Sequence, residues 1–250
     1  LENFEQQRQE TRNLVEQIGA ITPQGHSHPL FSNPNFVALI ATTLRNATDL
    51  GMPQLALTLT DSVTQAGDTL GADHPGTLIT RSNLAGAYQA AGRLQDAIPL
   101  FEQTLEDRSR LLGPDHPDTL VSRNNLAGAY QDADRLDEAI ALYESTLNTQ
   151  IDTLGADHPG TLITRSNLAS AYQDAGRLDD AIPLFEQTLE DRSRLLDPHH
   201  PHTLTTRNNL AEAYRAAGRF EEAKKLFETP SGSEDEQDGT EEDLDQETGD

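Results

Sequence analysis

The sequence predicts an all-α protein, a right-handed solenoid of about five antiparallel helix pairs. The first observation is a 42-residue repeat: Asp-His-Pro begins at residues 73, 115 and 157, and the related His-His-Pro begins at residue 199. The second is that each unit holds two segments with the apolar spacing of helices, with a glycine between them in most copies. The third is the absence of cysteine, which excludes a disulfide-held scaffold. A fixed period of about 20 to 50 residues is typical of stacked units.

The first expected element is an amphipathic helix over residues 2–18, with Phe4, Leu14, Val15 and Ile18 as its apolar residues. A linker rich in turn-forming residues follows and ends near Ser32. We therefore assign residues 1–31 to an N-terminal helix and linker, residues 32–230 to the solenoid, and residues 231–250 to a tail. The tail holds ten acidic residues, no basic residue and one apolar residue, so we expect it to be disordered.

The solenoid begins with a degenerate unit, residues 32–73. Helices are expected over residues 36–50 and 53–70, with Gly51 between them, but the polar and aromatic landmarks of the later units are missing. Such a unit is expected to cap the array, because a terminal unit has only one neighbour.

Three complete units span residues 74–115, 116–157 and 158–199, and a truncated unit spans residues 200–230. In the first complete unit, Leu84 and Tyr88 lie on one stripe of a helix over residues 77–91, and Gly92 ends it. Asp134 stands at the position of Gly92 in the next unit and tolerates the left-handed conformation. A second helix is expected over residues 94–112, with an acidic residue near its N-terminus in every copy.

The units were copied in pairs. Residues 68–113 and 152–197 differ at only four of 46 aligned positions. Recurrence of a residue between these two stretches is therefore weak evidence for its function.

The segment Asn-Leu-Ala-Gly-Ala-Tyr at residues 83–88, followed by Gly92-Arg93, Ala97 and Phe101, resembles the tetratricopeptide repeat signature. The 42-residue length and the Leu-Gly-x-Asp-His-Pro linker are similar to the repeats of kinesin light chains and of many bacterial tetratricopeptide proteins. This resemblance implies a protein-interaction module whose first helices line an inner groove.

Polar and small residues recur on the groove-facing side of the first helices. The resemblance implies an asparagine ladder, in which side-chain amides hold the backbone of an extended peptide through a donor and an acceptor each. The alternative is that these amides bond neighbouring helices or reflect copying. The expected peptide-binding residues are Asn83, Asn125, Asn167, Asn209, Gly86, Gly128, Ser170, Gln89, Gln131, Gln173 and Arg215. Residues that differ between units, Asp132, Asp174 and Glu212, are expected to set specificity.

Four arginines, Arg81, Arg123, Arg165 and Arg207, recur on the packing stripe. They could form an anion site, but we expect them to pair with the recurring acids of the second helices, Glu102, Glu144, Glu186 and Glu228.

The composition and charge of the chain disfavour several classes of ligand. The chain has 18 basic and 42 acidic residues and a formal charge of −24, which disfavours nucleic acid and anionic membrane surfaces. The short histidine spacings at residues 26–28 and 199–202 are better explained as solvated linkers than as a metal site. No phosphate loop, metalloprotease motif or nucleophile elbow is present, so we expect neither an enzyme nor a cofactor.

The predicted function is an adaptor that binds an extended peptide of a partner protein. Without an apolar run of about 20 residues or a signal sequence, the prediction for its location is the cytoplasm. One alternative is the C-terminal sensor region of a larger signalling ATPase or protease-type effector. Another is a scaffold that assembles by self-association.

Overall fold

The computed structural model describes residues 2–21 and 28–228, so the acidic tail predicted at residues 231–250 lies outside the described residues. Regular structure in the described residues is helical. The α-helices, together with two 3₁₀ segments written η, are α1 (Glu2–Ile21), η1 (Pro29–Ser32), α2 (Pro34–Asp49), α3 (Pro53–Ala56), η2 (Leu57–Leu59), α4 (Thr60–Leu70), α5 (Pro75–Ala90), α6 (Leu94–Leu112), α7 (Pro117–Asp132), α8 (Leu136–Leu154), α9 (Pro159–Asp174), α10 (Leu178–Leu195), α11 (Pro201–Ala216) and α12 (Phe220–Lys225).

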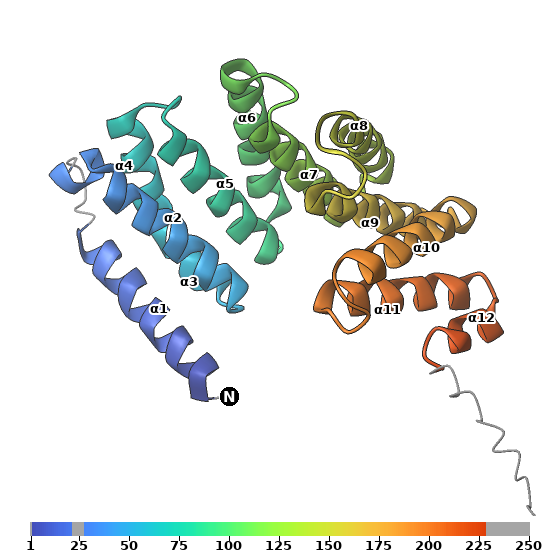
Figure 1. Cartoon of the computed structure of the whole chain (residues 1–250). Helices are drawn as coiled ribbons and strands as arrows, with labels where there is room; N and C mark the ends of the chain where they lie inside the picture. The colour runs from blue at the N-terminus through green and yellow to red at the C-terminus, as the bar shows by residue number, and fades with distance from the viewer. Residues whose placement is uncertain (1, 22–27, 229–250) are drawn as a thin grey trace, which may run out of the picture.

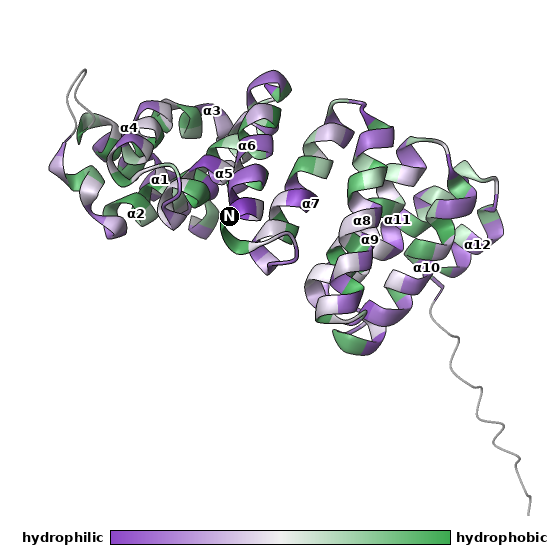
Figure 2. Cartoon of the chain, turned by 90° about the horizontal axis from the view of Figure 1, so that it is seen from above, coloured by the Kyte–Doolittle hydropathy of each residue, from purple (hydrophilic) through white to green (hydrophobic). Residues whose placement is uncertain are grey.

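The helices stack in chain order, from α1 at one end to α12 at the other (Figure 1). From α6 onward each helix packs chiefly on the helices before and after it, whereas α5 packs chiefly on α2 and α6; the first helices of later adjacent units also touch. The predicted all-α solenoid of helix pairs is confirmed. Most helices carry both hydrophobic and hydrophilic stretches, as expected when one stripe of each faces its neighbours (Figure 2).

The turn inside each unit is the predicted left-handed one. Gly92 has φ +72°, and Asp134, its counterpart in the next unit, has φ +58°. The backbone N–H of Arg93 then reaches back to the carbonyl of Tyr88 at 2.8 Å, which ends α5 in the manner of a Schellman motif.

The repeating histidine has a structural task that the sequence reasoning missed. His74, His116, His158 and His200 each precede the proline that begins a first helix, and Nδ1 of each accepts the backbone N–H two residues further on, at 3.0–3.2 Å. The histidine thus satisfies one of the unpaired N–H groups at a helix N-terminus. The signal was available, because a polar residue directly before proline is the ordinary position of a helix cap.

The second helix of the degenerate unit departs from the prediction. A continuous helix was expected over residues 53–70, but 3₁₀ segment η2 separates α3 from α4. The hydroxyls of Thr58 and Thr60 donate to the carbonyls three residues earlier, at 2.7 Å each. Such side-chain bonds compete with the helical backbone pattern. At the N-terminus, α1 buries Val15 and Ile18 as predicted, whereas Phe4 is 45% exposed.

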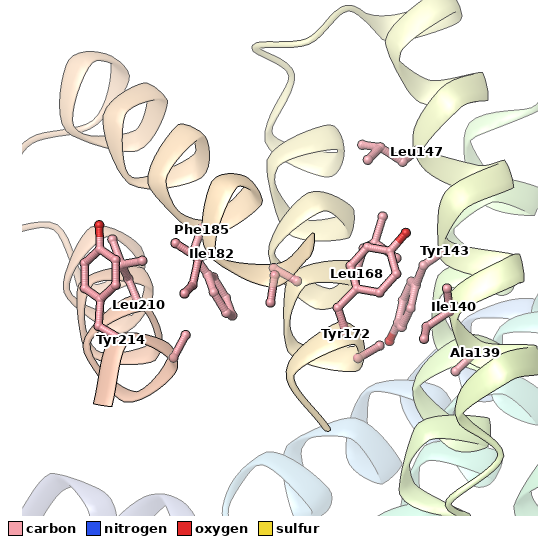
Figure 3. Close-up of a cluster of buried hydrophobic side chains, with 14 of the residues drawn as sticks. Ala139, Ile140, Tyr143, Leu147, Leu168, Tyr172, Ile182, Phe185, Leu210 and Tyr214 are labelled. Carbon is pink, nitrogen blue, oxygen red and sulfur yellow. The ribbon is translucent and has the colours of Figure 1, made fainter. Parts of the chain in front are cut away.

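The core repeats from one unit to the next. Phe185 and Ile182 of α10 lie between Leu168 and Tyr172 of α9 on one side and Leu210 and Tyr214 of α11 on the other (Figure 3). Small residues of the first helices, such as Ala169 and Ala211, are fully buried and let neighbouring helices approach closely.

Adjacent units are also joined by a tyrosine. The hydroxyl of Tyr130 donates to Glu102 of the preceding unit at 2.7 Å, Tyr214 donates to Glu186 at 2.6 Å, and Tyr172 donates to Glu144. An arginine of the turn covers each ring, with its Cζ atom 4.0–4.4 Å from the ring centroid. The prediction that these glutamates pair with the arginine column is therefore wrong, because the tyrosine of the next unit reaches them first.

These tyrosines predict a loss of stability at alkaline pH. Burial and the hydrogen bond to glutamate raise the pKa of Tyr130, Tyr172 and Tyr214 to about 12. An unfolded chain titrates near pH 10, so the stabilisation is complete below about pH 10 and is lost as the pH rises towards about 12. Urea unfolding at fixed pH values should show the midpoint falling across this window. In the variant with all three tyrosines changed to phenylalanine, the urea midpoint should fall less steeply with pH. An equal fall in both proteins would contradict the assignment of the pH dependence to these tyrosines.

Candidate functional site

The candidate site is the face formed by the first helices α2, α5, α7, α9 and α11, which we call the first-helix face. It carries three large apolar side chains at equivalent positions, Ile79, Val121 and Ile163, which are 45%, 51% and 42% exposed. Solvent-exposed side chains of this size in a row indicate a surface that can accept a partner.

The four asparagines of the predicted ladder are half-buried, but they are not equivalent. Asn83 donates from Nδ2 to the carbonyl of Ala41 at 2.8 Å and so joins α5 to α2. Within the described residues the side chains of Asn125, Asn167 and Asn209 make no hydrogen bond. Asn83 therefore fits the alternative in which the amide bonds a neighbouring helix. The side-chain N–H and C=O groups of the other three asparagines have no partner among the described residues.

The glutamines form a second column with an unexpected partner. Gln89 donates from Nε2 to Asp132 at 2.6 Å, and Gln131 donates to Asp174 at 2.6 Å. Each bond joins the first helices of adjacent units. Gln173 lacks this acceptor because Ala216 stands at the equivalent position.

Two of the predicted specificity residues, Asp132 and Asp174, thus also hold the face together. The sequence signal was a glutamine near the end of one first helix followed 43 residues later by an aspartate at the end of the next first helix.

The small residues provide unequal amounts of room. A Cβ added at Gly86 would have no atom within 4 Å, whereas one at Gly128 would lie 3.3 Å from the hydroxyl of Tyr143. Ser170 donates its hydroxyl to the carbonyl of Ser166 at 3.2 Å. Open space above the face is therefore found at Gly86, and Gly128 is packed.

The last first helix, α11, carries the remaining predicted residues. Asn209 is half-buried, and Glu212 and Arg215 are exposed. In the described part of the chain neither Glu212 nor Arg215 takes part in an ion pair. Both charges are available to a partner.

Two equivalent cavities open beside this face, and the sequence reasoning missed them. One, of about 340 Å³, is lined by Leu78, Ile79, Leu111 and Leu112, and the other, of about 380 Å³, by their counterparts 84 residues later. Each also contains a buried arginine, Arg108 or Arg192, whose pKa is lowered by burial. At the junction between them, Gln150 and Thr153 replace the arginine and one leucine.

The buried arginines are held mainly by neutral groups. Arg108 donates to the hydroxyl of Ser122 at 2.7 Å and to the backbone carbonyl of Asp118 at 3.2 Å. Arg192 donates to the hydroxyl of Thr206 and to two backbone carbonyls. Neither makes a side-chain ion pair within residues 2–21 and 28–228.

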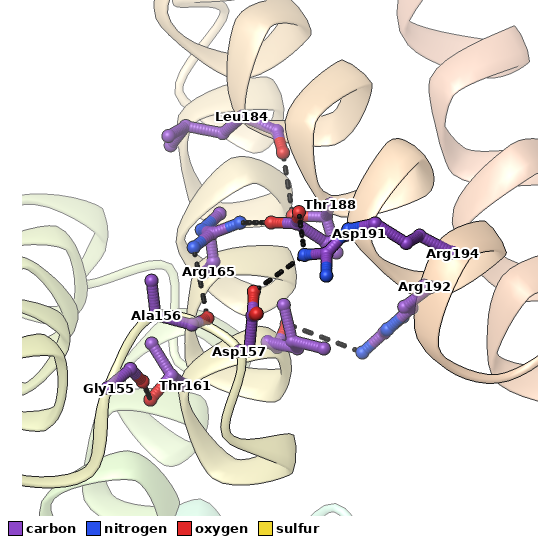
Figure 4. A network of polar contacts seen from close by, with 11 residues as sticks. Gly155, Ala156, Asp157, Thr161, Arg165, Leu184, Thr188, Asp191, Arg192 and Arg194 are labelled. Atoms are coloured by element: carbon purple, nitrogen blue, oxygen red, sulfur yellow. Dashed lines mark hydrogen bonds and ion pairs between the residues drawn. The ribbon is translucent and has the colours of Figure 1, made fainter.

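The arginine column of the packing stripe pairs with aspartates instead of the predicted glutamates. Arg165 donates to Asp191 at 2.6 Å, and Asp191 also accepts from Arg194, which in turn donates to Asp157 (Figure 4). Arg81 makes the equivalent bond to Asp107 at 2.6 Å. These charges are already matched inside the protein, so they do not form an anion site.

The other two arginines of the column do not pair with an aspartate. The side chain of Arg207 donates to the carbonyl of Pro198 at 3.2 Å. In the unit of Arg123, Thr149 stands at the position of the pairing aspartate, and the Arg123 side chain makes no hydrogen bond among the described residues.

Among the described residues, no group of three or more histidine, aspartate or glutamate side chains is arranged to hold a metal ion. None of the described helices combines the length and the apolar character that crossing a membrane requires.

Comparison with known proteins agrees with this geometry. The family model described as "Tetratricopeptide repeat" matches residues 40–107, 77–152, 123–192 and 161–229. No curated protein matches the chain.

Among solved structures, nearly identical TPR-like repeats of a Podosopora anserina protein assigned as a kinesin light chain are 34% identical. That match has a TM-score of 0.66 and covers 78% of this chain and 92% of the other. BtubC (BKLC) from P. vanneervenii is 21% identical, with a TM-score of 0.68 and coverage of 90% and 88%. MamA from Desulfovibrio magneticus is 15% identical, with a TM-score of 0.52 and coverage of 76% and 90%.

Proposed function

The chain belongs to the tetratricopeptide repeat family, with units of the kinesin-light-chain-like kind, and on that premise we propose that it is an adaptor that binds an extended segment of a partner protein. Repeats of this family are in general scaffolds for protein–protein interaction. We place the proposed site on the first-helix face, within residues 32–230.

The observation that carries this proposal is the set of open amides at Asn125, Asn167 and Asn209 beside the exposed Val121 and Ile163. A peptide backbone presents alternating N–H and C=O groups, and a primary amide can bond to both. The apolar side chains of the same face offer contact area to the side chains of the peptide. Together they favour a ligand that is extended and partly apolar.

The amides without a partner in the protein are unevenly distributed along the face, and this supports a contact towards the C-terminal half. Asn83, Gln89 and Gln131 already bond within the protein, whereas Asn167 and Gln173 do not among the described residues. A peptide could bond to the first three only through the oxygen or the second N–H of an amide that is already held in place by another helix. We therefore propose that α7, α9 and α11 make the main backbone contacts.

Specificity in this proposal comes from charges and cavities. Glu212 and Arg215 are exposed and unpaired in the described residues, and one carboxylate oxygen each of Asp132 and Asp174 bonds to a glutamine. The two apolar cavities would receive side chains of the partner. The proposal assigns no catalytic residue, cofactor or nucleic-acid contact to the chain, and it places the adaptor in the cytoplasm.

The test is a peptide selected from a random displayed library against the 250-residue chain. Changing Asn125→Ala together with Asn167→Ala should weaken its affinity by at least about tenfold, because each neutral hydrogen bond contributes about 0.5–1.5 kcal/mol. Isothermal titration calorimetry measures the affinity, and thermal unfolding checks that stability is nearly unchanged.

Asn83→Ala is the matched control. It removes the bond to Ala41, so it should lower stability while leaving the peptide affinity within about twofold. If the double variant loses stability but binds as tightly as the original chain, the asparagines are structural and the proposed site is wrong.

A further inference from the structure

The cavity beside Arg192 contains a buried cation that no carboxylate of the described residues pairs with. Arg192 is 5% exposed and makes three hydrogen bonds, to the hydroxyl of Thr206 and to the backbone carbonyls of Leu162 and His202. A guanidinium has five N–H groups, so at least two of them have no acceptor within residues 2–21 and 28–228. A buried charge without a counter-ion is costly, and an anion that reached it would remove part of that cost.

The stacking of the units does not require a positive charge at this position. Gln150, the equivalent residue of the middle unit, is neutral and only 4% exposed. The helices around Gln150 pack on one another as those around Arg192 do. The guanidinium of Arg192 is therefore free to serve a role besides packing.

The charges around the buried arginine differ between the two cavities. Burial lowers the pKa of Arg108, and the nearby carboxylate of Asp118, which lines the first cavity, partly offsets this effect. In the second cavity His202 stands at the position of Asp118, and burial alone lowers the pKa of Arg192. The carboxylate that does line the second cavity, Asp157, is already paired with Arg194 at 2.8 Å. The uncompensated positive charge therefore lies in the second cavity.

The rest of the second cavity is mainly apolar and small. Leu162 lies at its base, and Ile163, Leu195 and Leu196 line it while being 42%, 41% and 43% exposed. Its volume of about 380 Å³ is near the lower end of the roughly 300–1,000 Å³ that small-molecule sites occupy. A ligand that matches this cavity is small, apolar along most of its length and anionic at one end.

We propose that the cavity beside Arg192 binds a small apolar carboxylic acid with a chain of about six to ten carbons. The carboxylate accepts the N–H groups of Arg192 that have no partner in the protein, and the hydrocarbon chain lies against Leu162, Ile163 and the two leucines of α10. Bound acid would compete with a partner side chain for this space. The acid site itself does not depend on the proposed peptide site, because none of the ladder asparagines lines the cavity.

Isothermal titration calorimetry of the 250-residue chain with octanoate tests the proposal. We expect a single site with a dissociation constant on the order of 100 µM. Octanamide has the same chain without the charge, and acetate has the charge without the chain, so each should bind at least about tenfold more weakly.

N-acetylleucine distinguishes a free acid from the carboxyl end of a protein. It has a carboxylate and an apolar side chain, but its amide would lie against an apolar lining, so it should bind at least about tenfold more weakly than octanoate. If it binds as tightly as octanoate, the ligand is a protein terminus and the proposed free acid is wrong.

Arg192→Gln copies the residue of the middle unit and should lower the affinity for octanoate at least about tenfold. Arg108→Gln makes the same change in the first cavity and is the matched control, with an affinity within about twofold of the original chain. Thermal unfolding checks that both variants are folded.

Exchanging the residue that differs between the cavities tests the role of charge. His202→Asp gives the second cavity the carboxylate of the first, so octanoate should bind at least about tenfold more weakly. Asp118→His removes that carboxylate from the first cavity and should raise the number of octanoate sites per chain from one towards two.

Three results would overturn the proposal. They are the absence of saturable octanoate binding at millimolar concentration, equal affinities for octanoate and octanamide, and unchanged octanoate affinity in a folded Arg192→Gln variant. Equal losses in Arg192→Gln and Arg108→Gln would also contradict it, because the second cavity alone is assigned to the acid.

Discussion

Phe185→Ala is expected to lower the free energy of unfolding of the C-terminal units by about 3–5 kcal/mol. Phe185 is fully buried between α9 and α11, and truncation leaves a void that packed helices fill only in part. Circular dichroism during urea unfolding measures the change. Because units of a solenoid can unfold separately, an earlier first transition is the expected form of the loss.

Phe227→Ala is the matched control for this change. The same ring at the equivalent position is 52% exposed, so its removal should cost about 1 kcal/mol or less in dilute solution. If both variants lose the same stability, burial by the next unit is not what makes Phe185 important.

Arg165→Met is expected to cost about 3 kcal/mol, which is the second large effect. The arginine side chain is 3% exposed and its partner Asp191 is 17% exposed, so the change leaves a carboxylate largely out of water. Breaking a buried pair from one side costs about 3–5 kcal/mol, and the remaining bond from Arg194 to Asp191 places the expectation at the lower end. Thermal and urea unfolding measure it.

Arg123→Met tests whether the stability lost in Arg165→Met comes from the ion pair or from the packing of the arginine side chain. Arg123 occupies the same position of the neighbouring unit, where Thr149 replaces the acid. Methionine keeps most of the aliphatic packing in both variants, so the cost at Arg123 should stay below about 1 kcal/mol. Similar losses at the two positions would show that the ion pair contributes little.

Much of the fold could be predicted because the information is local. The 42-residue period, the apolar stripe and the left-handed turn at Gly92 and Asp134 each depend on residues close in sequence. The break between α3 and α4 was missed because it arises from threonine hydroxyls competing with the backbone. A helical apolar pattern does not reveal that competition.

The pairing of side chains between units was harder to predict. Tyr172 meets Glu144 across 28 residues, and Gln131 meets Asp174 across 43. Which of several candidate acids a side chain reaches depends on how two helices cross, and a recurring column alone does not fix that angle. The same limit explains why Arg165 was assigned to a glutamate and not to Asp191.

The candidate site was predictable in outline and not in detail. The face and its asparagines follow from helical spacing, but only the structure separates Asn83, bonded to Ala41, from Asn125 and Asn167. The apolar cavities combine the beginning of one helix with the end of another and the first turn of the next unit. Their lining residues run from Asp73 to Asp118 in one cavity and from Asp157 to His202 in the other, so no short motif marks them.

The bonds between units reach only the neighbouring unit, and this has a genetic consequence. Residues 68–113 and 152–197 are nearly identical, so recombination between the two copies would remove or add 84 residues without creating an unfamiliar junction. Each unit would still meet a neighbour whose tyrosine or glutamate it already fits. Recombination can therefore change the length of the protein in steps of two helix pairs, while each remaining interface between units keeps the same kinds of residues in contact.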